Sequence, residues 1–257
     1  MRICVCVKQV PDPEKFPIGR YTSDGRLARD GFPKATNPLD KHAAELALSL
    51  AQPQDIEAIT MGPESAKEAL RDLLAMGVGG ACHVQDNLLT GSDLLTTAMS
   101  LAAAIKKCGD FDLVICGAKS TDAELGVLPA MLAELLGISS VLGVEKLEAL
   151  EGEVRASVPS DKGVEVWKVK TPCLVSVTKN INVPRLPSLR GMTKAMQVEI
   201  VEYNFSDLEI EMPANRPRFM EHVVAESKAE VEMIEGETSE EIAGKLFTAL
   251  KLKGVIS

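Results

Sequence analysis

One stretch of the chain, residues 112–129, passes from a strand-like segment through a polar loop into a helix. An apolar run ends at Gly117, small and polar residues follow, and apolar residues recur at helical spacing from Val127. α/β proteins bind phosphate at such a junction, because the first helical turn has unpaired N–H groups and the helix dipole favours an anion there. The stretch therefore predicts an α/β fold with a phosphate-binding loop.

Strands and helices alternate through the first half of the chain, which indicates βαβ units and a parallel sheet. Strands are predicted at 3–7, 56–61, 81–85 and 112–117, and helices at 38–51, 64–76 and 93–107. Asn37 is the expected cap of the first helix and Ser92 that of the third. Residues 13–36 are irregular, with a small hairpin expected over 21–28. The fold class is thus a doubly wound, mostly parallel, Rossmann-like sheet.

The pattern changes after Gly137. Short strands at 141–149, 153–159 and 164–170 predict a β-hairpin extension, and the run 173–178 is expected to return to a mixed main sheet. The α/β nucleotide-binding domain then covers 1–181. Residues 182–200 are basic and punctuated by proline, whereas 201–257 are acidic and end in a short amphipathic helix. The last segment lacks the apolar content for its own core and is expected to be an arm on a partner.

Composition excludes several function classes. A net charge of −9 and an aromatic content of 4% argue against a nucleic-acid partner, which needs basic surfaces and stacking platforms. No apolar run approaches the roughly 18 residues of a membrane span, so neither membrane insertion nor export is expected and the predicted location is cytoplasmic. Six cysteines without a Cys-x-x-Cys pair indicate free buried thiols, and the three scattered histidines indicate no metal site.

The candidate ligand residues follow the carboxyl ends of the predicted strands. Backbone groups around Cys6 and Met61 are candidates for reading an adenine edge, Asn37 for a ribose contact, and Ser120–Leu128 for phosphate. The full candidate set is Cys6, Val7, Lys8, Asn37, Asp40, Met61, Gly62, Gly117, Ser120, Thr121, Asp122, Glu124, Leu125, Gly126, Val127 and Leu128. The alternative is that each loop only turns the chain and that Asn37 only caps its helix.

No catalytic constellation accompanies these loops. The chain has neither Gly-x-Gly-x-x-Gly after its first strand nor a Walker sequence, so a standard dinucleotide or P-loop enzyme is not expected. Asp122 and Glu124 are an acid–base pair only in principle, and capping of the following helix is the simpler interpretation. We therefore predict no catalytic residue.

Taken together, several short motifs resemble the β subunit of electron transfer flavoproteins, a family also called FixA-like. They are Val5-Cys-Val-Lys-Gln-Val-Pro-Asp12, Asn37-Pro-x-Asp40, Met61-Gly-Pro63, Ala75-Met-Gly77, Asp112-Leu-Val-Ile-Cys-Gly117 with Ser120-Thr-Asp122, and Arg185-x-Pro-Ser-Leu189 followed by Lys194-Ala195. The resemblance runs from residue 1 to the C-terminus.

The resemblance implies an electron-carrier subunit rather than a stand-alone enzyme. It implies a heterodimer with an α subunit that carries the electron-transferring FAD, and AMP held for structural reasons in the β subunit. The alternative is the electron-bifurcating branch, in which the β site holds a second FAD that accepts hydride from NADH. A stand-alone adenine-nucleotide sensor or hydrolase on a similar fold is a third hypothesis.

The resemblance also assigns the C-terminal third. Residues 182–200 correspond to a recognition loop whose leucine, here Leu189, enters a pocket on a flavin dehydrogenase such as an acyl-CoA dehydrogenase. The implied partner-binding residues are Arg185, Leu186, Pro187, Ser188, Leu189 and Met192. Residues 201–257 correspond to an arm docking on the α subunit.

Two departures from the family pattern bear on the partner and on the cofactor. Ala195 is followed by Met-Gln-Val-Glu, where many members have a run of lysines, which leaves open whether the partner is a typical acyl-CoA dehydrogenase. The 120s loop lacks the Gln and additional Asp and Gly residues usual in the bifurcating branch, which favours AMP over FAD in the β site. In contrast, Lys8–Asp12 and the helix with Asp93 resemble bifurcating or nitrogen-fixation-linked members.

Overall fold

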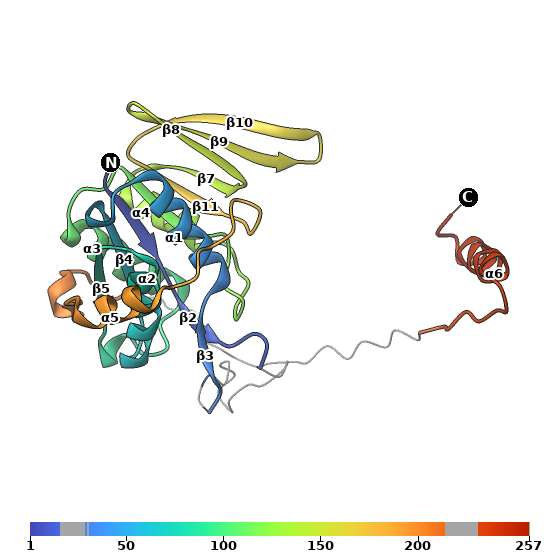
Figure 1. The fold of residues 1–257 in the computed structure, drawn as a ribbon, viewed down its shortest axis with the longest axis horizontal. Coiled ribbons are helices and arrows are strands. Elements are labelled where there is room, and N and C mark those ends of the chain that lie inside the picture. The colour runs from blue at the N-terminus through green and yellow to red at the C-terminus, as the bar shows by residue number, and fades with distance from the viewer. Residues whose placement is uncertain (16–28, 30, 214–230, 257) are drawn as a thin grey trace. The chain divides into compact units, whose positions relative to one another are not determined.

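A seven-stranded parallel sheet is the centre of the first structural unit, Met1–Met220 (Figure 1). The computed structural model describes residues 1–15, 29, 31–213 and 231–256, so the hairpin predicted over 21–28 lies outside the described residues. The sheet has the order β12-β5-β4-β1-β6-β11-β7, and every neighbouring pair is parallel. Its strands are β1 (Ile3–Cys6), β4 (Ile56–Met61), β5 (Gly80–Val84), β6 (Leu113–Gly117), β7 (Ser139–Val144), β11 (Cys173–Val177) and β12 (Val201–Tyr203).

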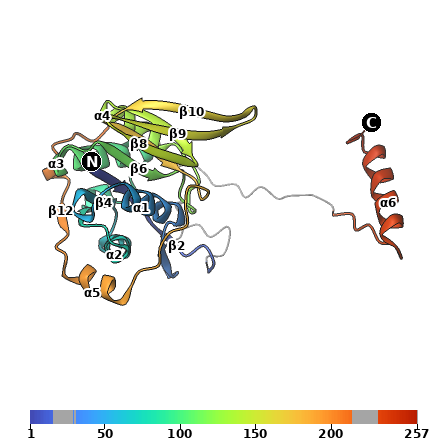
Figure 2. The same ribbon diagram turned by 45° about the horizontal axis from the view of Figure 1, so that its top comes forward.

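Helices cover both faces of this sheet, which confirms the doubly wound α/β class (Figure 2). They are α1 (Pro38–Leu50), α2 (Lys67–Met76), α3 (Leu94–Cys108) and α4 (Leu128–Leu136). Alternate residues of β1 point to opposite faces. Ile3 and Val5 join the core under α1 and α2, whereas Cys4 and Cys6 join the core under α3 and α4.

The predicted hairpins form a separate antiparallel sheet rather than part of a mixed one. It consists of β8 (Lys146–Leu150), β9 (Glu153–Ser160) and β10 (Gly163–Lys170). The single strand predicted over 141–149 is two strands, because Gly143 has a positive φ of 74° and the chain leaves the main sheet after Val144. The run 173–178 returns to the main sheet as predicted, pairing with β6 and β7.

Smaller elements complete the unit. The ribbon β2 (Gln9–Pro11) and β3 (Lys34–Thr36) is antiparallel. Short 3₁₀ turns in the described residues are η1 (Pro53–Asp55), η2 (Glu64–Ala66), η3 (Asn87–Leu89) and η4 (Ser206–Leu208), and α5 spans Leu189–Gln197. The cap of α3 is Asp93, not Ser92: the Asp93 carboxylate accepts the Thr96 N–H at 2.7 Å, while the Ser92 hydroxyl donates to the Leu89 carbonyl.

The predicted arm, residues 201–257, begins too early, because the first unit continues to Met220. Val201–Tyr203 pairs in parallel with β5 as the edge strand of the main sheet. The second unit, Glu221–Ser257, contains α6 (Ser239–Leu252), close to the predicted helix 240–251. Among the described residues, no helix combines the length and apolar character needed to cross a bilayer. All six cysteines are free, and five of them are buried.

Candidate functional site

The candidate site lies where the winding of the sheet changes direction. The chain leaves β1 through α1 towards β4 on one side, whereas β6 pairs with β1 on the other side. Loops that diverge from two neighbouring parallel strands leave a crevice at the carboxyl ends of these strands. Residues 7–9 follow β1 and residues 117–128 end and follow β6, so both lie where such a crevice is expected.

A buried carboxylate, Asp40 of α1, joins the two strand ends. Its Oδ2 accepts the Lys8 N–H at 2.8 Å and its Oδ1 accepts the Gly117 N–H at 3.2 Å. Burial raises the pKa of Asp40 to about 7, although these N–H donors favour the ionised form. Position 117 needs glycine because a Cβ there would overlap Asp40 and Leu39.

Asn37 does not cap α1 with its side chain, so the capping alternative for this residue is wrong. Instead its amide group donates to the Lys119 carbonyl at 3.0 Å, and its carbonyl oxygen accepts the Thr121 N–H at 3.2 Å. A short side chain at the start of α1 thus holds the loop after β6 in position.

The loop after β6 is also tied by an ion pair. Asp122, whose side chain is only 1% exposed, lies 2.7 Å from Lys8 Nζ and 2.7 Å from Arg29 Nη2. Lys8 Nζ also donates to the Ser120 hydroxyl at 3.3 Å. Burial would raise the pKa of Asp122, but the Lys8 ammonium and the hydrogen bonds from Lys8 and Arg29 lower it to about 2. Lys8 and Arg29 carry two positive charges against the single negative charge of Asp122, and this excess suits an anionic ligand.

Asp122 and Glu124 neither form an acid–base pair nor cap α4. Asp122 is held ionised, and Glu124 pairs with Lys119 at 3.0 Å. The position before α4 is Val127, which has no capping side chain. The prediction that these carboxylates cap the helix is wrong, because α4 begins only at Leu128, four residues after Glu124 and six after Asp122.

The end of this loop is open to solvent. Leu125 is 61% exposed and Val127 46% exposed, and Gly126 has a positive φ of 64°. Thr121 and Glu124 use their backbone N–H groups within the protein, the latter towards the Ser120 carbonyl at 2.9 Å. The first turn of α4, from Leu128, follows at once and has no side-chain cap. A helix start of this kind is suited to an anion.

The remaining candidates, Cys6, Val7, Met61 and Gly62, lie at the ends of β1 and β4. Cys6 and Val7 are buried. The Val7 N–H donates to the Ile59 carbonyl at 2.9 Å and the Val7 carbonyl accepts the Thr60 hydroxyl at 2.7 Å. Gly62 follows Met61, donates its N–H to Val84 and accepts a bond from His83. The turns after β1 and β4 are therefore rigidly held beside the crevice.

The predicted recognition segment divides into anchors and exposed apolar side chains. Arg185 forms a bidentate pair with Glu45 of α1, at 2.8 and 3.0 Å, and Ser188 caps α5 by accepting the Gly191 N–H at 3.0 Å. Pro187 is half-buried. Leu186, Leu189 and Met192 are exposed, the first two by 90% and 84%. The segment from 182 to 188 is irregular, but Leu189 begins a helix.

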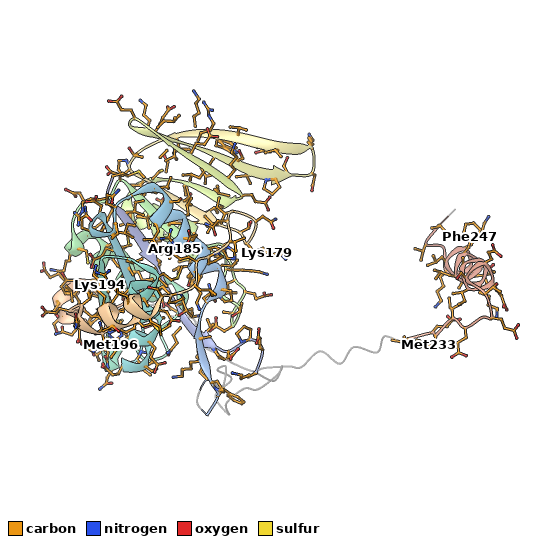
Figure 3. The ribbon with its side chains drawn as sticks, in the orientation of Figure 1. Lys179, Arg185, Lys194, Met196, Met233 and Phe247 are labelled. Carbon is orange, nitrogen blue, oxygen red and sulfur yellow. The ribbon has the colours of Figure 1, made fainter. Side chains whose placement is uncertain are left out.

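The structure adds residues to the candidate site and to the recognition segment that the sequence does not predict. Met196, labelled in Figure 3, is 72% exposed and follows Leu189 and Met192 at helical spacing. This spacing is visible in the sequence and predicts that the three side chains share one helix face. Arg71 of α2 donates to the carbonyls of Ala195 and Val198 and so fixes α5. Neither Arg71 nor Arg29 stands in a motif, so no local signal identifies them.

A shallow hollow of about 450 Å³ lies away from the crevice, between α3, α4 and η4. Met99, Leu135, Leu208 and Ile210 are among the residues lining it, and it includes none of the predicted site residues. The candidate site is therefore identified by its hydrogen bonds and ion pairs and not by this hollow, whose lining includes Lys106, Lys107 and Glu209.

Comparisons with known proteins agree with this arrangement. The family model described as "Electron transfer flavoprotein domain" matches residues 24–208. Caffeyl-CoA reductase-Etf complex subunit CarD of Acetobacterium woodii is 33% identical, with both chains covered in full. The electron transfer flavoprotein subunit beta of Clostridium acetobutylicum is 37% identical over 82% of this chain and 81% of that protein, and that of Megasphaera elsdenii 35% identical over 78% and 77%. The chain therefore belongs to the electron transfer flavoprotein family, as a β subunit.

Proposed function

We propose that this chain binds AMP in the crevice between β1 and β6 and, as the β subunit of a heterodimer, helps to pass electrons between a dehydrogenase and an acceptor through the FAD of the α subunit. The observation that carries the proposal is the positively charged loop junction at the switch point of the sheet. Lys8 and Arg29 neutralise Asp122 with one charge to spare, and the uncapped start of α4 lies at the end of the same loop. Family membership supports an association with flavin and nucleotide.

The residues present fit a nucleotide's phosphate rather than a reacting centre. Polar groups in the loop are engaged with one another, as in the Lys8–Asp122 and Asn37–Thr121 contacts. The proposed task of these residues is to hold the ligand and keep the loop closed around it. The exposed side chains of Leu186, Leu189 and Met192 are proposed to contact a flavin dehydrogenase, such as an acyl-CoA dehydrogenase.

The test is the nucleotide content of the purified heterodimer. Denaturation followed by mass spectrometry and flavin absorbance should give one AMP and one FAD for each heterodimer. A preparation that contains no adenine nucleotide, or no flavin with any α subunit, would contradict the proposal.

A second candidate is an electron-bifurcating β subunit with its own FAD, which accepts hydride from NADH. It is favoured by the full-length similarity to the subunit of a caffeyl-CoA reductase–Etf complex, since that relative alone among those compared above covers the entire chain. Two FAD for each heterodimer and bleaching of the flavin by NADH would select this candidate. One FAD with one AMP would exclude it.

A further inference from the structure

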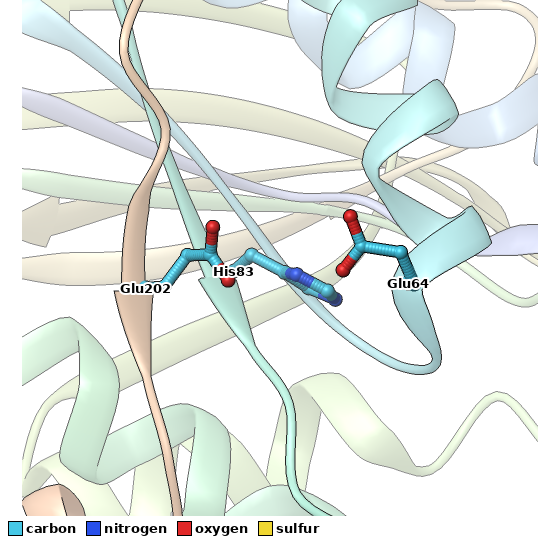
Figure 4. A group of neighbouring side chains, drawn as sticks. All are labelled: Glu64, His83 and Glu202. Atoms are coloured by element: carbon cyan, nitrogen blue, oxygen red, sulfur yellow. The ribbon is translucent and has the colours of Figure 1, made fainter.

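Three side chains that the nucleotide site does not use converge at the other edge of the sheet. Glu202 of β12 and His83 of β5 are register partners in the parallel ladder, so their side chains share one face. Glu64 of η2 approaches the same place from the turn after β4. One nitrogen of His83 and one carboxylate oxygen of each glutamate all lie within 4.8 Å of one another, and the imidazole lies between the two carboxylates (Figure 4).

The hydrogen bonding of His83 resembles that of a histidine that binds a metal ion. His83 is fully buried, and its Nε2 lies 3.0 Å from the carbonyl oxygen of Gly62. An imidazole that donates from Nε2 to a carbonyl has its lone pair on Nδ1, and Nδ1 is buried without a hydrogen-bond partner. A backbone carbonyl on one ring nitrogen with a free lone pair on the other is the usual arrangement of an imidazole ligand.

Lys67 bridges the two carboxylates but supplies one positive charge for two negative ones. Lys67 Nζ lies 2.8 Å from Glu64 Oε1 and 2.8 Å from Glu202 Oε1. These ion pairs engage the glutamates but leave the Nδ1 lone pair of His83 without a hydrogen bond. A cation that took the place of the ammonium could satisfy all three side chains.

We propose that Glu64, His83 and Glu202 bind a divalent transition-metal ion, with Lys67 as the internal cation that the ion displaces. One imidazole nitrogen and two carboxylate oxygens suit Zn²⁺ or a neighbouring first-row ion, whereas Mg²⁺ and Ca²⁺ prefer oxygen ligands throughout. Zinc–ligand bonds of about 2.0–2.2 Å bring ligand atoms closer together than in the metal-free cluster. The glutamates, with side chains 68% and 55% exposed, are free to make that small movement.

The ion would join three segments at the edge of the sheet, namely β12, β5 and the turn after β4. β12 is three residues long and pairs on one side, with β5. A bound ion adds a bond from Glu202 to His83 and to the turn containing Glu64. It would therefore hold the edge strand that follows α5, independently of whether the nucleotide proposal is correct.

Calorimetric titration of the metal-stripped full-length chain with Zn²⁺ tests the site. We expect one tight site for each chain, weakened at least about tenfold by His83→Gln and by Glu202→Gln. Glu209→Gln is the matched control, since Glu209 is also an exposed carboxylate paired with a lysine, at 2.7 Å from Lys107. Its affinity for Zn²⁺ should equal that of the unchanged chain.

Lys67→Gln separates a metal site from an ordinary ion pair. Removing the competing ammonium should tighten Zn²⁺ binding several-fold, and Zn²⁺ should slow hydrogen exchange in residues 201–203. Equal affinities of the Glu202 and Glu209 variants, or no tightening in Lys67→Gln, would overturn the proposal. Co²⁺ serves as a second probe, because binding at the free cysteines would produce thiolate absorption that the nitrogen and oxygen ligands do not.

Discussion

Asp40 shows how a single buried carboxylate organises the crevice. It accepts the N–H groups that follow β1 and end β6, so the two strand ends share one acceptor. The same burial raises its pKa to about 7, which makes its protonation respond to pH in the physiological range. The protonation state of Asp40 therefore bears on the two hydrogen bonds that join the strand ends.

The stability of the chain should carry a pH signature of Asp40. Its folded pKa of about 7 lies above the ordinary 3.8, so the folded state retains a proton that the unfolded state loses. The free energy of unfolding contributed by Asp40 is fully present below about pH 4 and falls by up to about 4 kcal/mol as the pH rises through 7. Asp40→Asn should abolish this slope, as measured by urea denaturation at several pH values. Parallel profiles for the two chains would contradict the assignment.

Lys8→Met should destabilise the chain by about 1–3 kcal/mol, because it removes one of the two cations from the buried Asp122 carboxylate. The matched control is Lys119→Met in the same loop, whose 3.0 Å pair with Glu124 is exposed. It should change stability by less than about 0.5 kcal/mol. Chemical denaturation near pH 7 measures both, and the nucleotide content of Lys8→Met should fall. Equal losses of stability in the two variants would show that the buried Lys8–Asp122 pair stabilises the chain no more than the exposed Lys119–Glu124 pair.

At the scale of an element, α5 is a short helix that packs on α2 with one face and exposes apolar side chains on the other. Gly191 lies against the Ala75 carbonyl, where a Cβ would not fit, and Ala195 is buried towards α2. Leu189, Met192 and Met196 form the exposed stripe on the other side. An exposed apolar stripe on a fixed helix is suited to brief docking of a partner surface.

Leu189→Ala and Met196→Ala should each raise the apparent KM for a partner dehydrogenase by roughly tenfold, because each truncates an exposed apolar contact. Neither should change nucleotide content, since α5 lies away from the crevice. Gln197→Ala, on the same helix and exposed, is the control and should leave KM unchanged. Steady-state electron transfer measures all three. An unchanged KM in Met196→Ala would limit the docking surface to the residues that the sequence alone indicates.

At the scale of the whole molecule, both core clusters lie in the first unit, and in the described part of the second unit no residue is buried. Every residue of the two core clusters lies before position 213. In contrast, α6 has no buried residue, and Ile242, Leu246 and Phe247 are exposed along it. A helix with an unburied apolar face is stable only against another surface, which supports the proposed role as an arm on the α subunit.

Removing residues 221–257 should therefore leave a folded chain that no longer holds its α subunit. Circular dichroism should show a cooperative transition close to that of the full chain, because no core residue is lost. Gel filtration with the α subunit should show separate peaks instead of a heterodimer. If the shortened chain still forms the heterodimer, the arm is not the main attachment.

The local pattern of the sequence determines the elements and their order. Alternating apolar strands and amphipathic helices predict the parallel sheet, and the motif after β6 predicts which loops meet at the crevice, because strand ends in such a sheet share one edge. Helical spacing over residues 189–196 also places Met196 on the same face as Leu189 and Met192. These features depend on neighbours in sequence, and the sequence therefore reveals them.

Only the tertiary structure decides which distant side chains pair. Asn37 reaches the loop at Lys119 and Thr121 rather than capping its own helix, and Arg29 completes the charge pair of Asp122. β12 joins the sheet beside β5 and so brings Glu202 to His83. These contacts join residues separated by many positions and no local preference encodes them, because each depends on where the folded backbone places its partner.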